Sequence, residues 1–399
     1  IACGGTGGHL APGIALAQRL LKAGHACELL ISSKQVDKRL IQKYPELKFH
    51  GLPAVALKGG VASLFKFGWS QLTSLAFCLK LIGSFRPTAV VGFGGFLTVS
   101  AGVAAYLTGT PLLLHEANHR VGRTIRLLAG MAHTVYLPPE IEIIPKQIRR
   151  KSIAYAGMPL RSDLEKISKE EARRELGFPL RGKLLVITGG SQGASILNRW
   201  ASEHETLLME AGIHLLCITG PGNEDGHVRE IELPLGQIAR SRFISFSDRM
   251  NYVYAAADLV VARAGAGTIA ELTAFQTPSL LIPYPFAADD HQRANAAHIE
   301  KLGGALCLDE THMENLFREV VYTLKSETLT DAIRDNLKKL RLEEPTTRIL
   351  KDIENLRHTP LKKASASEDK GPSDEKFFAS LSAQGLELEK IKFSQNEPL

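Results

Sequence analysis

Residues 3–9 of the chain read Cys-Gly-Gly-Thr-Gly-Gly-His, and this glycine-rich stretch is the strongest guide to the fold. Ile14, Ala17 and Leu20 follow it at helical spacing, so the loop is expected to open a helix. Such a loop exposes free backbone N–H groups at the positive end of a helix dipole, which favours a phosphate group or another anion. His9 lies at the edge of the loop, where the dipole favours a neutral imidazole that can act as a base.

Strand and helix signals alternate along the rest of the chain. Residues 183–188 form an apolar strand that runs into a second glycine loop, residues 189–193, which opens another helix. This alternation predicts an α/β fold with parallel sheets, in which ligands bind at the carboxyl ends of the strands. We expect two Rossmann-like domains that face each other across a cleft. The expected strands cover residues 1–3, 27–32, 88–91, 111–115, 134–137, 153–156, 183–188, 213–219, 243–246, 259–262 and 279–282.

The first domain is expected to span residues 1–157 and the second residues 158–340. Helices are predicted at residues 162–176 and 291–302 and over much of residues 313–357, with residues 341–358 packing back on the first domain. Residues 359–399 are polar, and we expect a mainly disordered tail. The chain begins at Ile1, inside an expected strand, so we expect a few further residues before it.

The overall composition is that of an ordinary globular protein in which basic residues outnumber acidic ones. The formal net charge of +6 makes an anionic partner plausible, and nucleic acid, a phosphorylated substrate and an anionic membrane all fit at this level. The five cysteines are scattered and contain no Cys-x-x-Cys pair, which argues against a disulfide framework and a zinc site. No apolar run reaches the ~20 residues of a membrane-spanning helix, and no signal peptide is visible.

Two common nucleotide-binding motifs do not fit the first glycine loop. A dinucleotide fingerprint that starts at Gly5 and Gly7 would need glycine where Leu10 stands, and residues 31–34 lack the acidic residue that it also requires. No Gly-Lys-Ser/Thr motif is present either. The chain also lacks an Asp-x-Asp pair, so we expect no metal and no cofactor, and helix dipoles would stabilise a leaving diphosphate.

Two segments of the second half have both a structural and a functional interpretation. Thr268 and Glu271 match a helix capping box, but a carboxylate at Glu271 can equally accept hydrogen bonds from the two hydroxyls of a ribose. Residues 289–295 match a helix start, although Gln292 and Asn295 would also suit sugar hydroxyls. In the second glycine loop, Ser191 and Gln192 add neutral donors for phosphate oxygens.

Residues 57–86 combine aromatic side chains with lysines. A buried helix with solvated lysines is the better interpretation from Leu72 onward. The start of the segment also fits a patch that lies at a membrane surface. The residues of this candidate patch are Phe65, Lys66, Phe67 and Trp69.

Five motifs in chain order carry a family resemblance. They are Gly4-Gly5-Thr6-Gly7-Gly8-His9, Gly92-Phe93-Gly94-Gly95-Phe96, His115-Glu116-Ala117-Asn118, Gly189-Gly190-Ser191-Gln192-Gly193 and the segment from Gly265 to Glu271. Together they resemble the MurG family of bacterial peptidoglycan N-acetylglucosaminyltransferases. The resemblance covers the body of the chain from Gly4 to about Gly304 and excludes the tail.

The resemblance implies a GT-B fold and an inverting transfer of GlcNAc from UDP-GlcNAc to the 4-hydroxyl of the MurNAc unit of lipid I, which gives lipid II. It places His9 as the base, the loops with Gly5, Gly94 and Gly95 on the acceptor diphosphate, and the aromatic–lysine patch on the membrane. The implied donor-binding residues are Thr6, Gly7, Gly8, Asn118, Arg161, Ser191, Gln192, Ser247, Ala266, Gly267, Thr268, Glu271 (on the ribose) and Gln292.

The implied partners are undecaprenyl-linked lipid I, the anionic inner membrane on its cytoplasmic face, and the cell-wall and division machinery, which would connect the protein with cell shape and the cell cycle. Nucleic acid is not among them. Four positions depart from the family pattern without removing a residue assigned to chemistry: Ala117, Met158, Ser247 and His291. A UDP-GlcNAc 2-epimerase on the same fold and a non-catalytic nucleotide-sugar-binding protein remain as alternatives.

Overall fold

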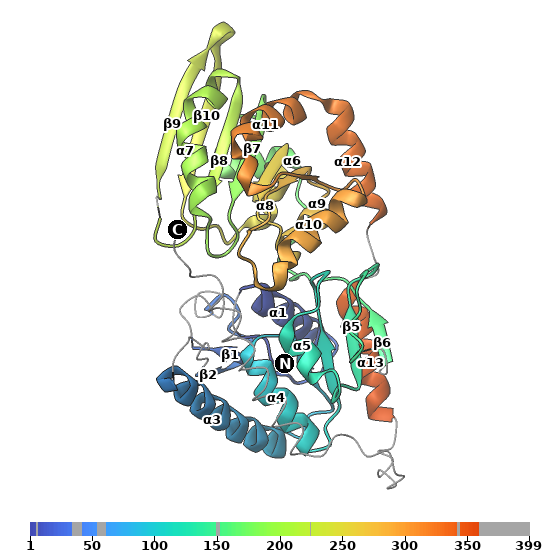
Figure 1. Cartoon of the computed structure of the whole chain (residues 1–399). Helices are drawn as coiled ribbons and strands as arrows, with labels where there is room; N and C mark the ends of the chain where they lie inside the picture. The colour runs from blue at the N-terminus through green and yellow to red at the C-terminus, as the bar shows by residue number, and fades with distance from the viewer. Residues whose placement is uncertain are drawn as a thin grey trace.

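The computed structural model describes residues 1–4, 7–33, 42–53, 61–148, 152–223, 225–340 and 344–358. The chain forms two α/β units, one stacked on the other, each with a sheet at its centre and helices around it (Figure 1). The expected tail, residues 359–399, lies outside the described residues. Within them, no helix combines the length and the apolar character needed to cross a membrane.

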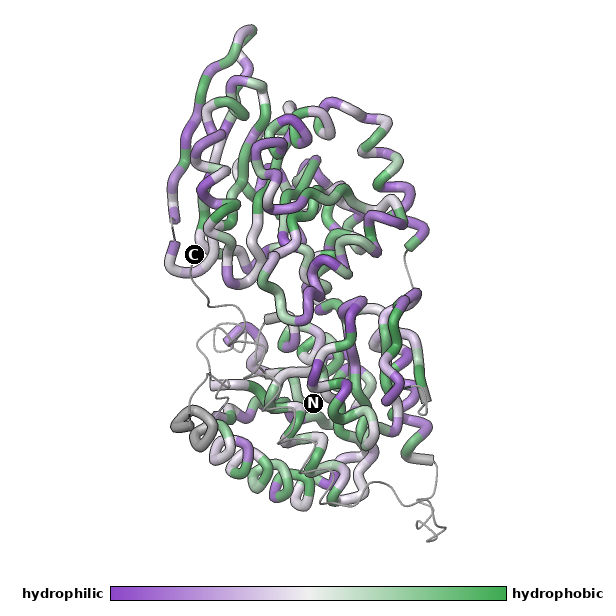
Figure 2. The backbone as a smooth tube through the Cα atoms, in the orientation of Figure 1, coloured by the Kyte–Doolittle hydropathy of each residue, from purple (hydrophilic) through white to green (hydrophobic). Residues whose placement is uncertain are grey.

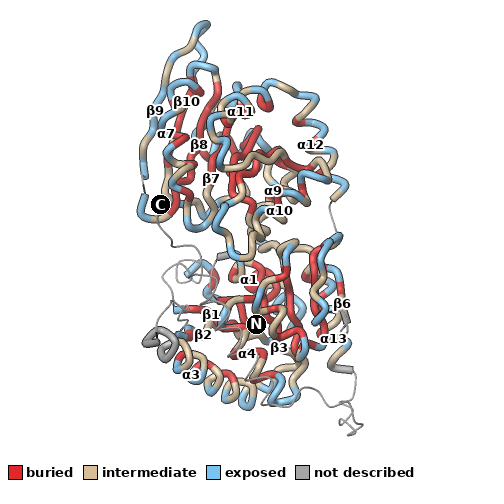
Figure 3. Tube along the Cα trace, viewed as in Figure 1, coloured by how far each residue is buried: buried red, intermediate tan, exposed pale blue. Residues whose placement is uncertain are grey.

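The first sheet is parallel throughout. Ala2 pairs with both Leu30 and Gly92, and so joins a two-stranded part to a four-stranded part. The strands are mostly buried on both faces, as expected where helices cover a parallel sheet (Figure 3). In spatial order they are β2 (Lys48–Leu52), β1 (Glu28–Ser32), β3 (Val90–Gly92), β4 (Leu112–His115), β5 (Thr134–Leu137) and β6 (Ser152–Tyr155).

The helices that pack on this sheet come from the first part of the chain and from the last described helix. They are α1 (Gly7–Lys22), α3 (Val61–Phe85), α4 (Phe96–Leu107), α5 (Arg123–Leu128) and α13 (Pro345–His358). The last helix returns from the second unit, and its Ile349 and Ile353 join a core with Ile14 and Leu20 of α1. The hydroxyl of buried Tyr136 on β5 donates a hydrogen bond to Asp352 over 2.8 Å, which also ties α13 to the first sheet.

The second sheet has seven strands, and all its pairs are parallel except the pair β9–β10. In spatial order they are β13 (Leu306–Cys307), β12 (Ser279–Leu281), β11 (Leu259–Ala262), β7 (Lys183–Thr188), β8 (Ile213–Ile218), β10 (Gln237–Ile244) and β9 (His227–Leu233). The apolar strands run through the middle of both units (Figure 2).

The helices of the second unit are α6 (Lys169–Leu176), α7 (Ser195–Glu210), α8 (Met250–Ala256), α9 (Ala266–Phe275), α10 (His291–Lys301), α11 (Leu316–Lys325) and α12 (Glu327–Lys339). Three short 3-10 turns accompany them, at Pro234–Gly236, Ala288–Asp290 and Glu310–Asn315. The loops that enter α9 and α10 lie at the boundary with the first unit, beside α1 and α5 (Figure 1).

Several elements differ from the sequence-based expectation. The helix predicted over residues 162–176 begins only at Lys169, because the Ser168 side chain caps it by accepting from the N–H of Glu171. The hairpin of β9 and β10 was missed apart from the end of β10, since β9 is polar and largely exposed. Strand β2 was missed for a similar reason, because it contains charged and partly exposed residues.

Candidate active site

His9 lies in the first turn of α1, and its ring packs against the loop between β3 and α4. A Cβ atom built on Gly94 would lie 3.1 Å from Nε2 of His9, and one built on Gly95 would lie 3.5 Å from its Nδ1. The glycine loop that leads into α1 and the loop that contains Gly94 and Gly95 therefore meet at the imidazole of His9. Gly4 belongs to the same contact, because a Cβ atom built on Gly95 would also lie 2.8 Å from the carbonyl oxygen of Gly4.

The backbone of the loop between β3 and α4 requires glycine at two positions. Gly94 and Gly95 have φ angles of 97° and 76°, which L side chains rarely adopt. Gly95 is the N-cap of α4, and the Thr98 hydroxyl donates to the carbonyl of Gly94 over 2.6 Å. The loop thus holds a fixed shape beside His9 and leaves backbone groups at a helix N-terminus, where an anion is favoured.

Burial, together with a smaller effect of the nearby His291, lowers the pKa of His9 to about 4. His9 is therefore neutral at pH 7, as the helix N-terminus suggested. His291 opens α10 of the second unit, and its Nδ1 lies 2.6 Å from the carbonyl of Ala288. The candidate base consequently lies where the two units meet.

A series of hydrogen bonds between polar side chains connects the two units near His9. Buried Glu116, just after β4, accepts from the side chain of Asn118 over 2.8 Å and from the N–H of Gly122 over 2.7 Å. The oxygen of Asn118 accepts from buried Asn295 on α10 over 3.1 Å. Asn295 also donates to the Ala264 carbonyl. The interpretation of Asn295 as a sugar ligand is therefore not supported, because its amide joins the units.

Glu271 is not part of a capping box. The N-cap of α9 is Gly265, without a side-chain cap, so Thr268 lies inside the first turn. The Glu271 carboxylate instead accepts a hydrogen bond of 2.8 Å from the hydroxyl of Tyr254. Burial raises the pKa of Glu271, while the charge of Arg161 acts to lower it. Arg161 and Glu271 are therefore electrostatic neighbours at the boundary between the units.

The other predicted donor-binding residues lie on loops and helix starts. Ala266, Gly267 and Thr268 form the first turn of α9, which begins near the boundary with the first unit and whose first N–H groups have no partner within the helix. Ser191 and Gln192 are exposed in the loop between β7 and α7, but no described contact brings them to the other residues. The Gln292 side chain accepts from the N–H of Tyr284 over 2.9 Å, and Ser247 accepts from the N–H of Arg249 over 3.2 Å.

Gly7 and Gly8 open α1 beside His9, whereas Gly5 and Thr6 lie outside the described residues. In the candidate membrane patch, Trp69 is 72% exposed on α3, and Phe67 makes an edge contact with Phe96 of α4 at 5.4 Å between ring centroids. The side chains of Phe65 and Lys66 lie outside the described residues. Leu72 is 62% exposed, so the expectation of a buried helix was wrong for this residue. From Leu75 onward, apolar side chains of α3 pack on the core of the first unit around buried Cys78, as expected.

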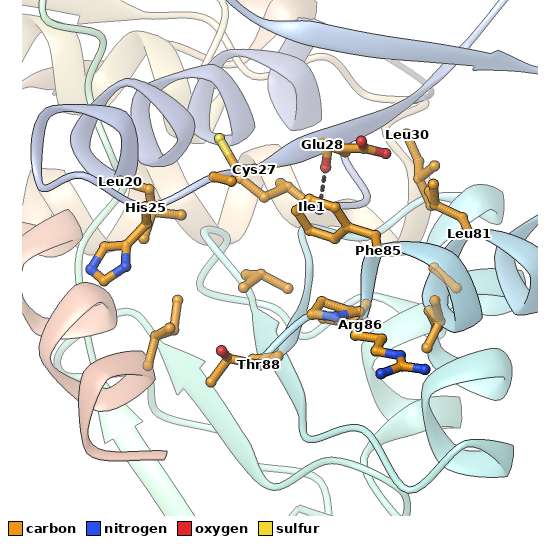
Figure 4. Close-up of a pocket in the computed structure, with 18 of the residues that line it drawn as sticks. Ile1, Leu20, His25, Cys27, Glu28, Leu30, Leu81, Phe85, Arg86 and Thr88 are labelled. Atoms are coloured by element: carbon orange, nitrogen blue, oxygen red, sulfur yellow. Dashed lines mark hydrogen bonds between the residues drawn. The ribbon is translucent and has the colours of Figure 1, made fainter. Parts of the chain in front are cut away.

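A cavity of about 320 Å³ lies elsewhere, at the amino ends of β1 and β3. It is lined by Cys27, Cys78, Phe85 and Arg86, and the amine of Ile1 donates to the Glu28 carbonyl at its wall (Figure 4). Ligands of parallel sheets bind at the carboxyl ends of strands, where His9 and the loop of Gly94 lie. The cavity is therefore separate from the candidate site.

Some residues of the boundary had no signal in the sequence. Tyr44 of the first unit accepts from Arg161 over 3.0 Å, and Arg123 of α5 pairs with Asp289 over 3.0 Å. Tyr254, which holds Glu271, is a third example. Each is an ordinary residue type whose partner is distant in sequence, so only the fold identifies it.

Two family models match the chain, one over each unit. The model described as "Glycosyltransferase family 28 N-terminal domain" matches residues 1–137, and "Glycosyltransferase family 28 C-terminal domain" matches residues 184–349. A UDP-N-acetylglucosamine--N-acetylmuramyl-(pentapeptide) pyrophosphoryl-undecaprenol N-acetylglucosamine transferase of Opitutus terrae is 42% identical over 362 residues, which cover 90% of this chain and 95% of the relative. A protein of the same name in Caldanaerobacter subterraneus subsp. tengcongensis is 30% identical over 363 residues, 88% of this chain and 98% of the relative.

The crystal structure of Acinetobacter baumannii MurG superposes with a TM-score of 0.64 at 23% identity, and the match covers 89% of this chain and 98% of that one. This likeness confirms the two-domain GT-B fold with facing parallel sheets. The relatives confirm the resemblance that the five motifs indicated. The chain therefore belongs to the MurG family, the N-acetylglucosamine transferases of glycosyltransferase family 28 that act on N-acetylmuramyl-(pentapeptide) pyrophosphoryl-undecaprenol.

Proposed function

We propose that this protein transfers GlcNAc from UDP-GlcNAc to the 4-hydroxyl of MurNAc in undecaprenyl-linked lipid I, and so forms lipid II for peptidoglycan synthesis. The observation that carries the proposal is the likeness to named transferases over nearly the whole chain. It is a UDP-GlcNAc-dependent N-acetylglucosaminyltransferase. The contact of His9 with the loop of Gly94 and Gly95 supports the chemistry, because a base and an anion-binding loop lie side by side.

In the proposed reaction, a ring nitrogen of His9 takes the proton of the acceptor hydroxyl. The hydroxyl oxygen then attacks the anomeric carbon, and the bond between that carbon and the diphosphate oxygen breaks as UDP leaves with the electron pair. Attack from the face opposite to UDP inverts the configuration. The neutral state of His9 supports this role, since a base must begin without the proton.

The second unit binds the donor in this proposal, together with Gly7, Gly8 and Asn118 of the first. Glu271 accepts from the ribose hydroxyls, and the first turn of α9 and Arg161 contact the diphosphate. Ser191, Gln192, Ser247 and Gln292 contact the rest of the donor. The half-buried carboxylate of Glu271 and its position beside Arg161 support this assignment, because a diol and a diphosphate are adjacent groups in UDP-GlcNAc.

A direct assay separates this function from its alternatives. Wild-type protein is incubated with UDP-GlcNAc, with and without a lipid I analogue, and UDP and sugar products are quantified. We expect UDP release that depends on the acceptor. Formation of UDP-ManNAc without acceptor would support the epimerase instead, and binding of UDP-GlcNAc without turnover would support a binding protein.

We further propose that α3 places the protein at the cytoplasmic face of the bacterial inner membrane, where the lipid-linked acceptor lies. The exposed Trp69 and Leu72 support this, together with the basic balance of the chain. Association with division machinery is part of the same proposal.

Replacing Trp69 by serine is expected to weaken binding to vesicles that contain phosphatidylglycerol by about tenfold, because an exposed indole contributes apolar area at a bilayer interface. Co-sedimentation measures this binding. Tyr322→Ser, on α11 of the second unit and 63% exposed, is the matched control and should bind as wild type does. Equal binding of the Trp69 variant and wild type would remove α3 as the membrane contact.

A further inference from the structure

Two consecutive side chains of the first unit reach across to the segment that leads into the second. The hydroxyl of Tyr44 donates to Asp163 over 2.9 Å and accepts from Nη1 of Arg161 over 3.0 Å. The ammonium group of Lys43 pairs with Asp163 over 2.7 Å and donates to the backbone carbonyl of Asp248 over 2.9 Å. Tyr44 itself is buried in the core that contains α1, so its ring is fixed by packing.

The Tyr44 hydroxyl bridges two opposite charges that form a long ion pair. Arg161 and Asp163 are 3.6 Å apart at their closest atoms, longer than the hydrogen bond that each makes to the hydroxyl. Burial raises the pKa of Tyr44 to about 12, so the hydroxyl keeps its proton at neutral pH and can both donate and accept. Without it, the guanidinium can close on the carboxylate in a direct two-bond pair, in competition with Lys43, because such groups favour that geometry.

Arg161 keeps donors for another partner. Its buried Nε makes no hydrogen bond within the part of the chain that the structure describes. The charge of Glu271 acts to raise the pKa of the same guanidinium, so the carboxylate proposed to bind ribose lies near it. A largely buried cation with an unused N–H, beside the carboxylate proposed to bind ribose, suits the diphosphate of a nucleotide sugar.

We propose that Tyr44 is a positioning residue for donor binding, whose hydroxyl keeps the Arg161 guanidinium from a two-bond pair with Asp163 and so available to the diphosphate of the nucleotide sugar. This role rests on the proposed function. Lys43 also contacts the second unit, at the carbonyl of Asp248 next to Ser247. Tyr44 and Lys43 thus connect the first unit to residues proposed to bind the donor.

Tyr44→Phe tests this role, because it removes the hydroxyl and keeps the ring. We expect the KM for UDP-GlcNAc and the Kd for UDP to rise about tenfold, while kcat and the KM for acceptor change less than threefold. Isothermal titration with UDP and steady-state kinetics give these values. Adding Asp163→Asn to the Tyr44 variant removes the charge that captures Arg161, so UDP affinity should recover by at least threefold.

Tyr136→Phe is the matched control, since it also removes a buried tyrosine hydroxyl bonded to an aspartate. It should lower the melting temperature and leave the Kd for UDP unchanged. If wild-type protein binds UDP and Tyr44→Phe binds it equally well, the inference is wrong and the proposed function stands. The inference is also wrong if both phenylalanine variants lose affinity alike. If wild-type protein binds no UDP, the proposed function and this inference both fail.

Discussion

Replacing His9 by alanine is expected to lower kcat by about a thousandfold, while the Kd for UDP stays within threefold of wild type. Loss of a positioned general base typically costs a factor of this size. UDP affinity should persist because the ring packs on the loop of Gly94 and Gly95 in the first unit, whereas most proposed donor contacts come from the second. Acceptor-dependent UDP release and isothermal titration measure the two quantities.

The pH profile provides an independent check of the same residue. The pKa of His9 in the free enzyme is lowered to about 4, chiefly by burial. The active base is the neutral form, so protonation removes activity only below that value. Between pH 7 and pH 5.5, kcat/KM should fall less than twofold, whereas a histidine with an ordinary pKa of about 6.5 would cause a loss of about tenfold.

His312→Ala is the control for this variant, because His312 is an exposed imidazole of the second unit. It should leave kcat unchanged. A His9→Ala protein that retains more than about a tenth of wild-type kcat would exclude His9 as the base. An acid limb near pH 6.5 that persists in His9→Ala would assign the titration to another group.

Replacing Glu271 by alanine is expected to raise the KM for UDP-GlcNAc by about thirtyfold with a smaller effect on kcat. The carboxylate is proposed to accept from two ribose hydroxyls, and hydrogen bonds to a charged group contribute about 1.5–3 kcal/mol. Its bond to Tyr254 and its position beside Arg161 hold it at the boundary between the units. Steady-state kinetics with varied donor measures the change.

A second ligand makes this test specific for the ribose. Wild type should bind UDP at least tenfold more tightly than 2′-deoxy-UDP, and Glu271→Ala should bind the two alike, because the acceptor of that hydroxyl is gone. Tyr254→Phe removes the hydrogen bond of 2.8 Å but keeps the carboxylate, so it should retain most of the discrimination. Equal effects of the two substitutions would mean that Glu271 acts only through structure.

Much of the fold follows from local sequence. The strands of both sheets that are buried on both faces were predicted within a few residues, since continuous apolar runs between turn signals identify them. The partly exposed strands β2 and β9 have no such run. At Glu271 the local pattern matched a capping box equally well, and the structure excluded this because the helix begins at Ala266.

The sequence by itself determined the two glycine-loop domains and the family, and it singled out His9 as the candidate base, because each depends on residue types at short, fixed spacings. It also indicated that His9 is neutral, since a helix N-terminus disfavours positive charge. Only the tertiary structure decided that His9 packs on Gly94 and Gly95, that Asn295 joins the units, and that Tyr44 bridges Arg161 and Asp163. These contacts join residues far apart in the chain, and their energies depend on burial and distance, which local patterns do not encode.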